Sequence, residues 1–144
     1  MQLRKMDHTA LIVQELERSR WFYGEVLGLQ EVPRPSNFTF GGSWFQGPGF
    51  QIHLILASDT SAPAGFAQVG EKDVRIGRAH HIAFEVDDVE KAMTTLRAHN
   101  IEIVGGPQPR GDGVTQFYIY DPDRNFLEFF AWDHESTMQN RQVN

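Results

Sequence analysis

The sequence predicts an α+β fold made of two tandem βαβββ modules. The first observation is a short apolar strand with a histidine near its start, which occurs twice, at 6–13 and at 79–86. In both strands a valine follows the histidine by five positions, so the two stretches align without a gap. The second observation is that a helical segment and three short strand candidates follow each strand in the same order. An internal repeat of this kind indicates a duplicated supersecondary unit.

The two helices are predicted from the spacing of their apolar residues. Apolar side chains recur every three or four positions over about 15–27 and about 88–99, as on the buried face of a helix. Asp87, with Glu90 three residues later, resembles a capping box and predicts the start of the second helix. Each helix is followed by a residue that readily takes the left-handed conformation of a helix end, namely Gly28 and Asn100.

Three short strands are expected after each helix, because Gly and Pro separate apolar stretches there. The expected strands are 30–34, 39–46 and 51–57 in the first module, and 102–105, 115–120 and 125–131 in the second. The chain of 144 residues is expected to form a single domain. Its expected parts are module one at about 5–57, a linker at 58–78, module two at about 79–131 and a tail at 132–144.

Composition argues against several classes of partner. A formal net charge of -6 and a pI near 5.4 argue against nucleic acid and anionic membrane surfaces. The sequence shows neither a signal-peptide pattern nor a long apolar segment, so we expect a cytoplasmic protein. There is no cysteine, and a bound metal must therefore use His, Asp or Glu.

Side-chain alternation along the strands predicts four polar groups on matched faces. In the first strand of each module, His8 and His81 lie opposite the face that packs against the helix. In the fourth strands, His53 and Glu128 stand between apolar neighbours at equivalent positions. A buried polar group without a partner costs roughly 1–3 kcal/mol, and more if it is charged. If a pseudo-twofold axis relates the modules, one divalent cation is the simplest common partner.

Four motifs occur in a characteristic order: DHTALIV at 7–13, WFYGEVLGL at 21–29, HIAFEV at 81–86 and DPDRNFLE at 121–128. With the order of the elements, they resemble the vicinal oxygen chelate superfamily. That group includes glyoxalase I, methylmalonyl-CoA epimerase, extradiol dioxygenases, and fosfomycin and bleomycin resistance proteins. The resemblance covers about 5–131. It implies curved mixed sheets around a metal-binding cleft, helices on the outside, a small-molecule substrate and a homodimer.

The resemblance also implies a ligand set for a divalent metal ion such as Zn, Ni, Co, Mn or Fe. By position, the ligands are His8, His53, His81 and Glu128. Position 53 departs from the pattern, because glyoxalase I and the epimerase usually have Glu or Gln there. Ile12 and Ala57 stand where bacterial glyoxalase I has an arginine and an asparagine. These two departures argue against glutathione-dependent glyoxalase activity.

The predicted function is a metal-dependent isomerase or lyase that removes a proton next to a carbonyl of a small substrate chelated through two adjacent oxygens. Glu128 is the only member of the ligand set able to serve as the base, and it is the expected catalytic residue. If His53 is not a ligand, the other three form the two-His-one-carboxylate set of non-haem Fe(II) oxygenases, and the alternative is an extradiol-type dioxygenase. A second alternative is a drug- or metabolite-binding resistance protein without catalysis.

Two further groups of residues receive structural interpretations. Arg110 lies in a stretch rich in Gly and Pro, where it could meet an anionic substrate, but it is interpreted as a solvated loop arginine. Trp44, Phe45, Phe117, Phe126 and Phe130 could line an apolar pocket, but they are interpreted as core residues, because aromatic side chains in strands are ordinarily buried.

Overall fold

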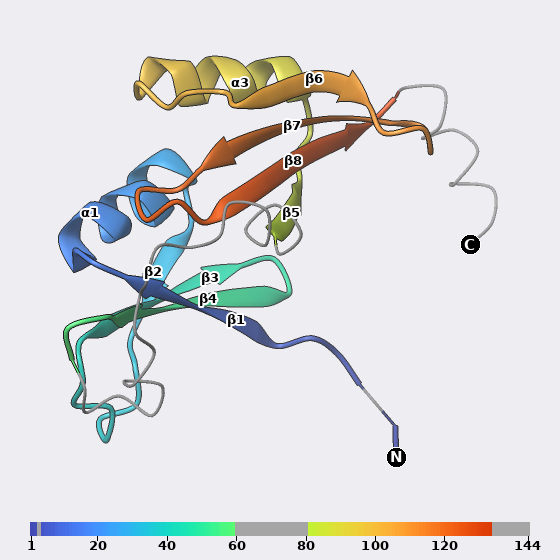
Figure 1. Cartoon of the computed structure of the whole chain (residues 1–144). Coiled ribbons are helices and arrows are strands. Elements are labelled where there is room, and N and C mark those ends of the chain that lie inside the picture. The colour runs from blue at the N-terminus through green and yellow to red at the C-terminus, as the bar shows by residue number, and fades with distance from the viewer. Residues whose placement is uncertain (3, 60–80, 134–144) are drawn as a thin grey trace. The chain divides into compact units, whose positions relative to one another are not determined.

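The computed structural model of the chain describes residues 1–2, 4–59 and 81–133, and the chain divides into two compact units, 1–72 and 73–144 (Figure 1). The first unit contains module one and the second contains module two. Each module has one four-stranded mixed sheet and one helical segment, which confirms the predicted α+β fold. The expected linker lies almost wholly outside the described residues, as does most of the expected tail.

Module one follows the predicted order of strand, helix and three strands. Its elements are β1 (His8–Val13), α1 (Leu16–Trp21), the π-helical turn η1 (Phe22–Val26), β2 (Gln30–Val32), β3 (Gly42–Gly47) and β4 (Phe50–Leu56). The sheet order is β1-β4-β3-β2, with β1 parallel to β4 and the other neighbours antiparallel. The helical segment α1 contacts β3 and β4. The fourth strand is therefore central in the sheet, between the first and the third.

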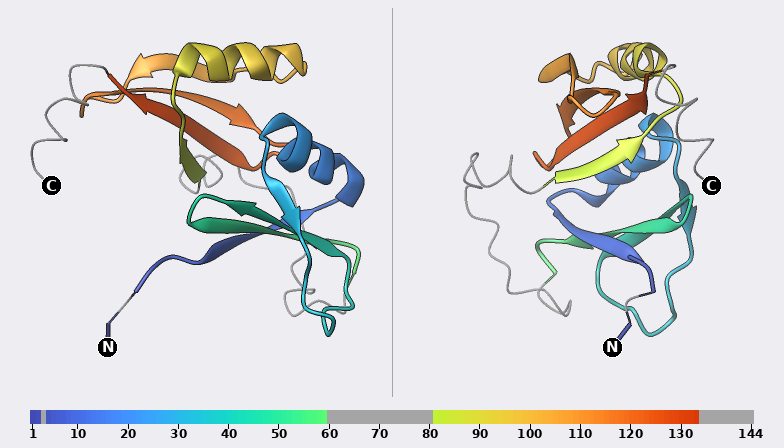
Figure 2. Two further views of the ribbon diagram at one scale, coloured as in Figure 1. Left: turned by 180° about the vertical axis from the view of Figure 1, so that it is seen from behind. Right: turned by 90° about the vertical axis from the view of Figure 1, so that its right-hand side faces the viewer.

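Module two repeats this topology. Its elements are β5 (His81–Glu85), α3 (Val89–Ala98), β6 (Gly105–Pro109), β7 (Val114–Tyr120) and β8 (Phe126–Trp132). The sheet order is β5-β8-β7-β6, and β5 is parallel to β8. Figure 2 shows α3 lying along one face of this sheet, where it contacts β7 and β8. Again the fourth strand, β8, is central.

Each module buries a core on the face that alternation predicts. The fully buried side chains of module one include Val13, Phe22, Tyr23, Phe45, Ile52 and Leu54. Those of module two include Met93, Val114, Phe117, Ile119 and Leu127. The core interpretation of Phe45 and Phe117 is thus confirmed, whereas Phe126 and Phe130 are only half-buried, on the other face of β8 (Phe126–Trp132). Burying one such side chain contributes about 1.5–3 kcal/mol, so a one-residue shift of β4 or β8, which would expose the whole set, is strongly disfavoured.

The predicted C-terminal ends of both helices are confirmed, whereas the predicted N-terminal cap of the second helix is corrected. Gly28 and Asn100 both have the expected positive φ, at 71° and 59°. The helix α3, however, is capped by Asp88 rather than by Asp87, so that expectation was wrong. The Asp88 backbone is extended, and its carboxylate accepts a hydrogen bond from the Lys91 N–H at 3.0 Å. Two consecutive aspartates make the capping pattern ambiguous by one position.

The strand expected at 102–105 is also misplaced. The structure has β6 at Gly105–Pro109, at the edge of the sheet next to β7, with a register shift between Gly105 and Gln108. Proline lacks the N–H that a ladder needs, but an edge strand tolerates it on its unpaired side. Apolar alternation over 102–105 therefore predicted the wrong stretch.

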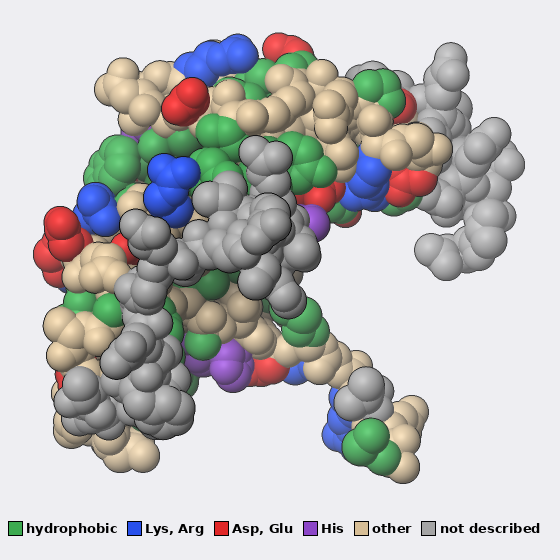
Figure 3. Space-filling model, viewed as in Figure 1, with side chains coloured by type: hydrophobic (Ala, Val, Ile, Leu, Met, Phe, Trp, Pro, Cys, Tyr) green, Lys and Arg blue, Asp and Glu red, His purple; other side chains and the backbone are tan. Residues whose placement is uncertain are grey.

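On the face shown in Figure 3, acidic and basic side chains of the described residues are interspersed. None of the helices in the described ranges has the length and apolar character of a membrane-spanning segment.

We predict that Asp88→Ala lowers the free energy of unfolding by about 1 kcal/mol, because it removes the side-chain acceptor at the start of α3. Urea unfolding followed by circular dichroism measures the change. Asp87→Ala is the matched control and should stay within about 0.5 kcal/mol of wild type, because the Asp87 side chain is exposed. The reverse order of the two effects would contradict the observed cap.

Candidate functional site

The strand register places the four predicted site residues at equivalent positions in their modules. In module one, His53 on the central strand β4 pairs with Ala10, two residues after His8. In module two, Glu128 on β8 pairs with Ala83, two residues after His81. The small alanine leaves room above it for the diagonal neighbours on the same face to approach each other. The repeat seen in the sequence is therefore also a repeat of the site.

The module one pair consists of stacked imidazoles. The ring centroids of His8 and His53 are 4.0 Å apart, with an angle of 16° between the ring planes. Trp44, the partner of His53 on β3, covers the other ring face at 3.9 Å and 1°. The His53 ring is thus enclosed on both faces, and the residue is only 9% exposed. Trp44 was interpreted as a core residue, but it belongs to the site.

Hydrogen bonds fix the orientation of both rings. His8 Nδ1 lies 2.9 Å from the carboxylate of Asp7, and this hydrogen bond lowers the pKa of Asp7 below its ordinary value, with help from Lys5. The Nε2 atom of His8 takes no part in this contact. His53 Nε2 lies 2.8 Å from Gln51 Oε1. Both contacts leave one nitrogen of each imidazole for another partner.

The environment of His53 favours the neutral imidazole. Burial is the main cause that lowers the pKa of His53, and the nearby His8 lowers it further, while Asp7 opposes the shift. A neutral imidazole retains the lone pair that binds a metal ion. Near neutral pH, His53 is therefore in the form that a ligand needs.

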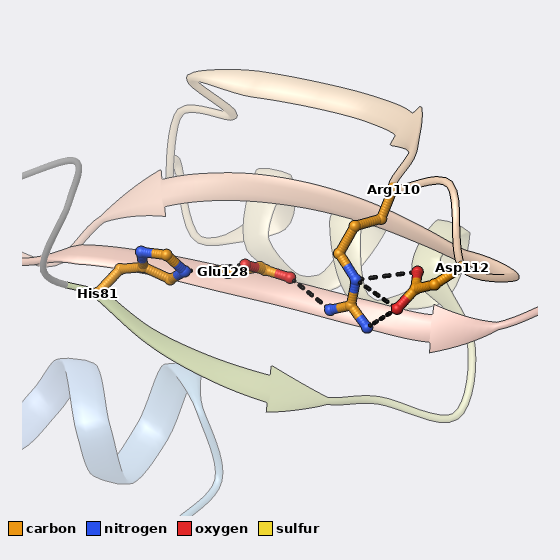
Figure 4. Close-up of polar contacts among 4 residues, drawn as sticks. All are labelled: His81, Arg110, Asp112 and Glu128. Atoms are coloured by element: carbon orange, nitrogen blue, oxygen red, sulfur yellow. Dashed lines mark hydrogen bonds and ion pairs between the residues drawn. The ribbon is translucent and has the colours of Figure 1, made fainter.

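The module two pair is an imidazole hydrogen-bonded to a buried carboxylate (Figure 4). His81 Nε2 lies 3.0 Å from Glu128 Oε2, and the Glu128 side chain is only 6% exposed. The other carboxylate oxygen, Oε1, accepts a hydrogen bond from Arg110 at 3.0 Å. Each oxygen of Glu128 thus has a charged or polar partner, as a buried carboxylate requires.

Arg110 is an exposed loop residue, as expected, but its side chain also contacts the buried Glu128, which the sequence did not predict. Its guanidinium forms an ion pair with Asp112 at 2.8 Å and lies over the ring of Phe130 at 4.7 Å. The ion pair lowers the pKa of Asp112 and raises that of Arg110. Because two carboxylates share one guanidinium, Arg110 is neutralised and holds Glu128 in place. It does not offer a free positive charge.

The structure brings the predicted residues together in pairs. It joins His8 to His53 within module one and His81 to Glu128 within module two. Within either module, the described residues form no group of three or more His, Asp or Glu side chains that could hold a metal ion. Sequence reasoning missed Arg110, Asp112, Trp44 and Gln51 as site residues. Strand alternation was a usable signal for Gln51, which lies on the same face of β4 as His53.

A family model of the Glyoxalase/Bleomycin resistance protein/Dioxygenase superfamily matches residues 5–129. The chain belongs to this superfamily. The match covers both modules and all four predicted site residues. Membership confirms the resemblance found in the sequence, and it leaves the reaction open because the superfamily contains several.

Known relatives in the superfamily include different enzymes. The chain is 26% identical over 134 residues to "Glyoxylase I 4" of Arabidopsis thaliana, covering 92% of this chain and 74% of that protein. It is 40% identical over 105 residues to a manganese-dependent 2,3-dihydroxybiphenyl 1,2-dioxygenase of Geobacillus genomosp. 3, covering 71% of this chain and 28% of that protein. A solved putative glyoxalase family protein from Bacillus anthracis has a TM-score of 0.73 at 26% identity, covering 92% and 98% of the two chains.

We predict a pH dependence of stability that His53 causes. In the unfolded chain an imidazole has its ordinary pKa of 6.5, and in the folded protein the pKa of His53 is lower. As pH falls below 6.5, the unfolded state binds the proton first, so this contribution to stability is present above 6.5 and is lost on acidification. Urea unfolding of the metal-free protein between about pH 7.5 and 5 measures it. In His53→Gln the fall should be smaller, and an identical pH profile would contradict the prediction.

Proposed function

We propose that this protein is a divalent-metal-dependent isomerase or lyase that removes a proton next to a carbonyl group of a small substrate. The observation that carries the proposal is the matched pairing of His8 with His53 and of His81 with Glu128 at equivalent register positions. We propose that the two pairs together hold one divalent cation, Zn, Ni, Co, Mn or Fe. The expected homodimer and cytoplasmic location remain predictions.

The chemistry of the donors supports a metal. Three imidazoles and one carboxylate are the nitrogen and oxygen ligands that divalent transition metals use. Asp7 contacts Nδ1 of His8, and a carboxylate on one ring nitrogen commonly orients a histidine that binds a metal through the other nitrogen. In the metal-free protein, the hydrogen bond between His81 and Glu128 offsets part of the cost of burying the carboxylate. Each pair joins one buried group, His53 or Glu128, to one exposed imidazole, His8 or His81, and a common charged partner explains why both pairs occur.

The residues of the site have different roles in the proposed proton transfer. When bound, the metal supplies Lewis acidity that stabilises negative charge on a substrate oxygen. Glu128 accepts the proton, since a carboxylate is the only group of the four that can act as a base while the imidazoles remain bound. Arg110, which Asp112 holds in an ion pair, fixes the orientation of Glu128 through its Oε1 atom. Trp44 and His8 enclose His53 and exclude water from its ring.

A second candidate function is an extradiol-type dioxygenase. If His53 is not a ligand, the remaining ligands are two histidines and a carboxylate. The dioxygenase relative from Geobacillus genomosp. 3 supports the same alternative, although the match covers only 28% of that enzyme. A resistance protein that binds a drug or metabolite without catalysis is the third candidate, and no specific contact of the site favours it.

Proton exchange tests the proposed reaction. Protein loaded with each of the five metals is incubated in D2O with a panel of small α-hydroxy ketones, 2-substituted malonyl thioesters and hemithioacetals. Proton NMR follows the loss of the substrate C–H signal. We expect exchange with at least one substrate, and Glu128→Gln should lower its rate by about 10²–10⁴-fold, the usual contribution of a general base.

Glu85→Gln is the matched control, because Glu85 is an exposed carboxylate on the neighbouring strand β5 and should leave the rate unchanged. Oxygen uptake with catechols and no proton exchange would support the dioxygenase instead. Exchange that survives in Glu128→Gln at the wild-type rate would remove Glu128 as the base.

A further inference from the structure

A chain of hydrogen bonds runs from the β3–β4 hairpin to the enclosed His53. Gln46 and Gln51 are register partners on β3 and β4, on the same sheet face as His53. Gln51 Nε2 donates to Gln46 Oε1 at 2.8 Å, and Gln51 Oε1 lies 2.8 Å from His53 Nε2. The two amides therefore connect the imidazole to the hairpin.

The donor and acceptor of each hydrogen bond between Gln46, Gln51 and His53 can be assigned, starting from the contacts of Gln46. Gln46 Nε2 contacts two backbone carbonyls, those of Gly47 and Phe50. A carbonyl can only accept, so this end of Gln46 must be its NH2 group and the other end its oxygen. Gln51 must then turn its NH2 group toward Gln46 and its oxygen toward His53. The usual ambiguity between amide oxygen and nitrogen is removed by the two carbonyls.

The consequence for His53 is a defined tautomer. Because Gln51 presents an oxygen that can only accept, His53 Nε2 must carry the proton and donate it. In the neutral ring, the lone pair then resides on Nδ1. Among the described residues, no hydrogen bond engages Nδ1 of His53, and both faces of the ring are covered by Trp44 and His8. Nδ1 is thus the nitrogen at which this imidazole can accept a new partner.

We propose that Gln46 and Gln51 are positioning residues that lock neutral His53 in the Nε2–H tautomer and present its Nδ1 to the metal. His8 has the opposite arrangement, since Asp7 engages its Nδ1 and leaves its Nε2. The adjacent histidines therefore present different nitrogens. The part of this inference that concerns the metal rests on the proposed function, whereas the tautomer is a property of the metal-free protein.

The tautomer is measured directly by NMR on the metal-free full chain with ring-¹⁵N histidine at about pH 8. Two-bond ¹H–¹⁵N correlations distinguish a protonated from an unprotonated ring nitrogen, and His53→Gln identifies the His53 signals. We expect wild type to show protonated Nε2 and unprotonated Nδ1. A protonated Nδ1 in wild type would overturn the proposal without any variant.

Gln46→Met is the sharpest variant, because Gln46 does not touch His53. It frees the Gln51 amide to turn, and we expect the Nδ1–H share of His53 to rise about fivefold, the equivalent of one net hydrogen bond. Gln51→Leu should have a similar effect. Gln51→Glu keeps an acceptor oxygen and should restore the wild-type tautomer. If the tautomer of His53 is unchanged in both Gln46→Met and Gln51→Leu, the two glutamines do not fix it, and the proposal is wrong.

Gln116→Met is the matched control, since Gln116 is a buried glutamine on a strand of the other module, and the His53 signals should not move. Titration with Cd²⁺ then separates the two proposals. We expect the His53 Nδ1 signal to shift on binding, and a shift of Nε2 instead would overturn the assignment of the ligating atom. If no metal binds but His53 has the expected tautomer, the proposed function is wrong, and the role of Gln46 and Gln51 in fixing the tautomer is still supported.

Discussion

The alternation of side chains along the two central strands is the constraint on which the candidate site depends. On β4 the buried Ile52 and Leu54 flank His53, and on β8 the buried Leu127 and Phe129 flank Glu128. The core residues cannot leave the core without a cost of several kcal/mol, so the polar residues between them cannot leave the opposite face. Both strands are also paired on both sides, which prevents local slippage. The fold thus holds an imidazole and a carboxylate where water reaches them poorly.

The two modules meet this constraint with different chemistry. Module one holds a neutral imidazole between two aromatic rings and satisfies its Nε2 through glutamine amides, without a formal charge. Module two holds a carboxylate and satisfies it with His81 on one oxygen and Arg110 on the other. One module therefore supplies neutral lone pairs and the other supplies a negative charge. That asymmetry is what the proposed proton transfer needs, since only one of the four side chains has to change its protonation state.

Much of this arrangement was predictable from the sequence, because strand periodicity and core burial determine it. The repeat, the order of helix and strands along each module and the faces of His8, His53, His81 and Glu128 all follow from apolar spacing. The position of β6 did not, since two prolines and a register shift obscure its alternation. Arg110 was missed for a different reason. A long side chain that follows a strand reaches its partner through a rotamer choice, which no spacing rule contains.

The hydrogen bonds of Gln46 and Gln51 are only partly predictable from the sequence. Their common face follows from alternation, but their contact depends on the β3–β4 register, which the hairpin sets. A one-residue error in that turn would separate them. Polar networks of this kind therefore become visible only when the pairing of strands is known.

X-ray absorption of the cobalt- or zinc-loaded full chain tests most directly the proposal that His8, His53, His81 and Glu128 bind one cation. Multiple scattering from imidazole rings counts the histidine ligands. We expect one ion per chain with three imidazoles and a carboxylate, and two imidazoles in His53→Gln. If wild type already shows only two imidazoles, His53 is not a metal ligand, and the result favours the extradiol-type dioxygenase. One imidazole or fewer, or no stoichiometric metal, would contradict the claim.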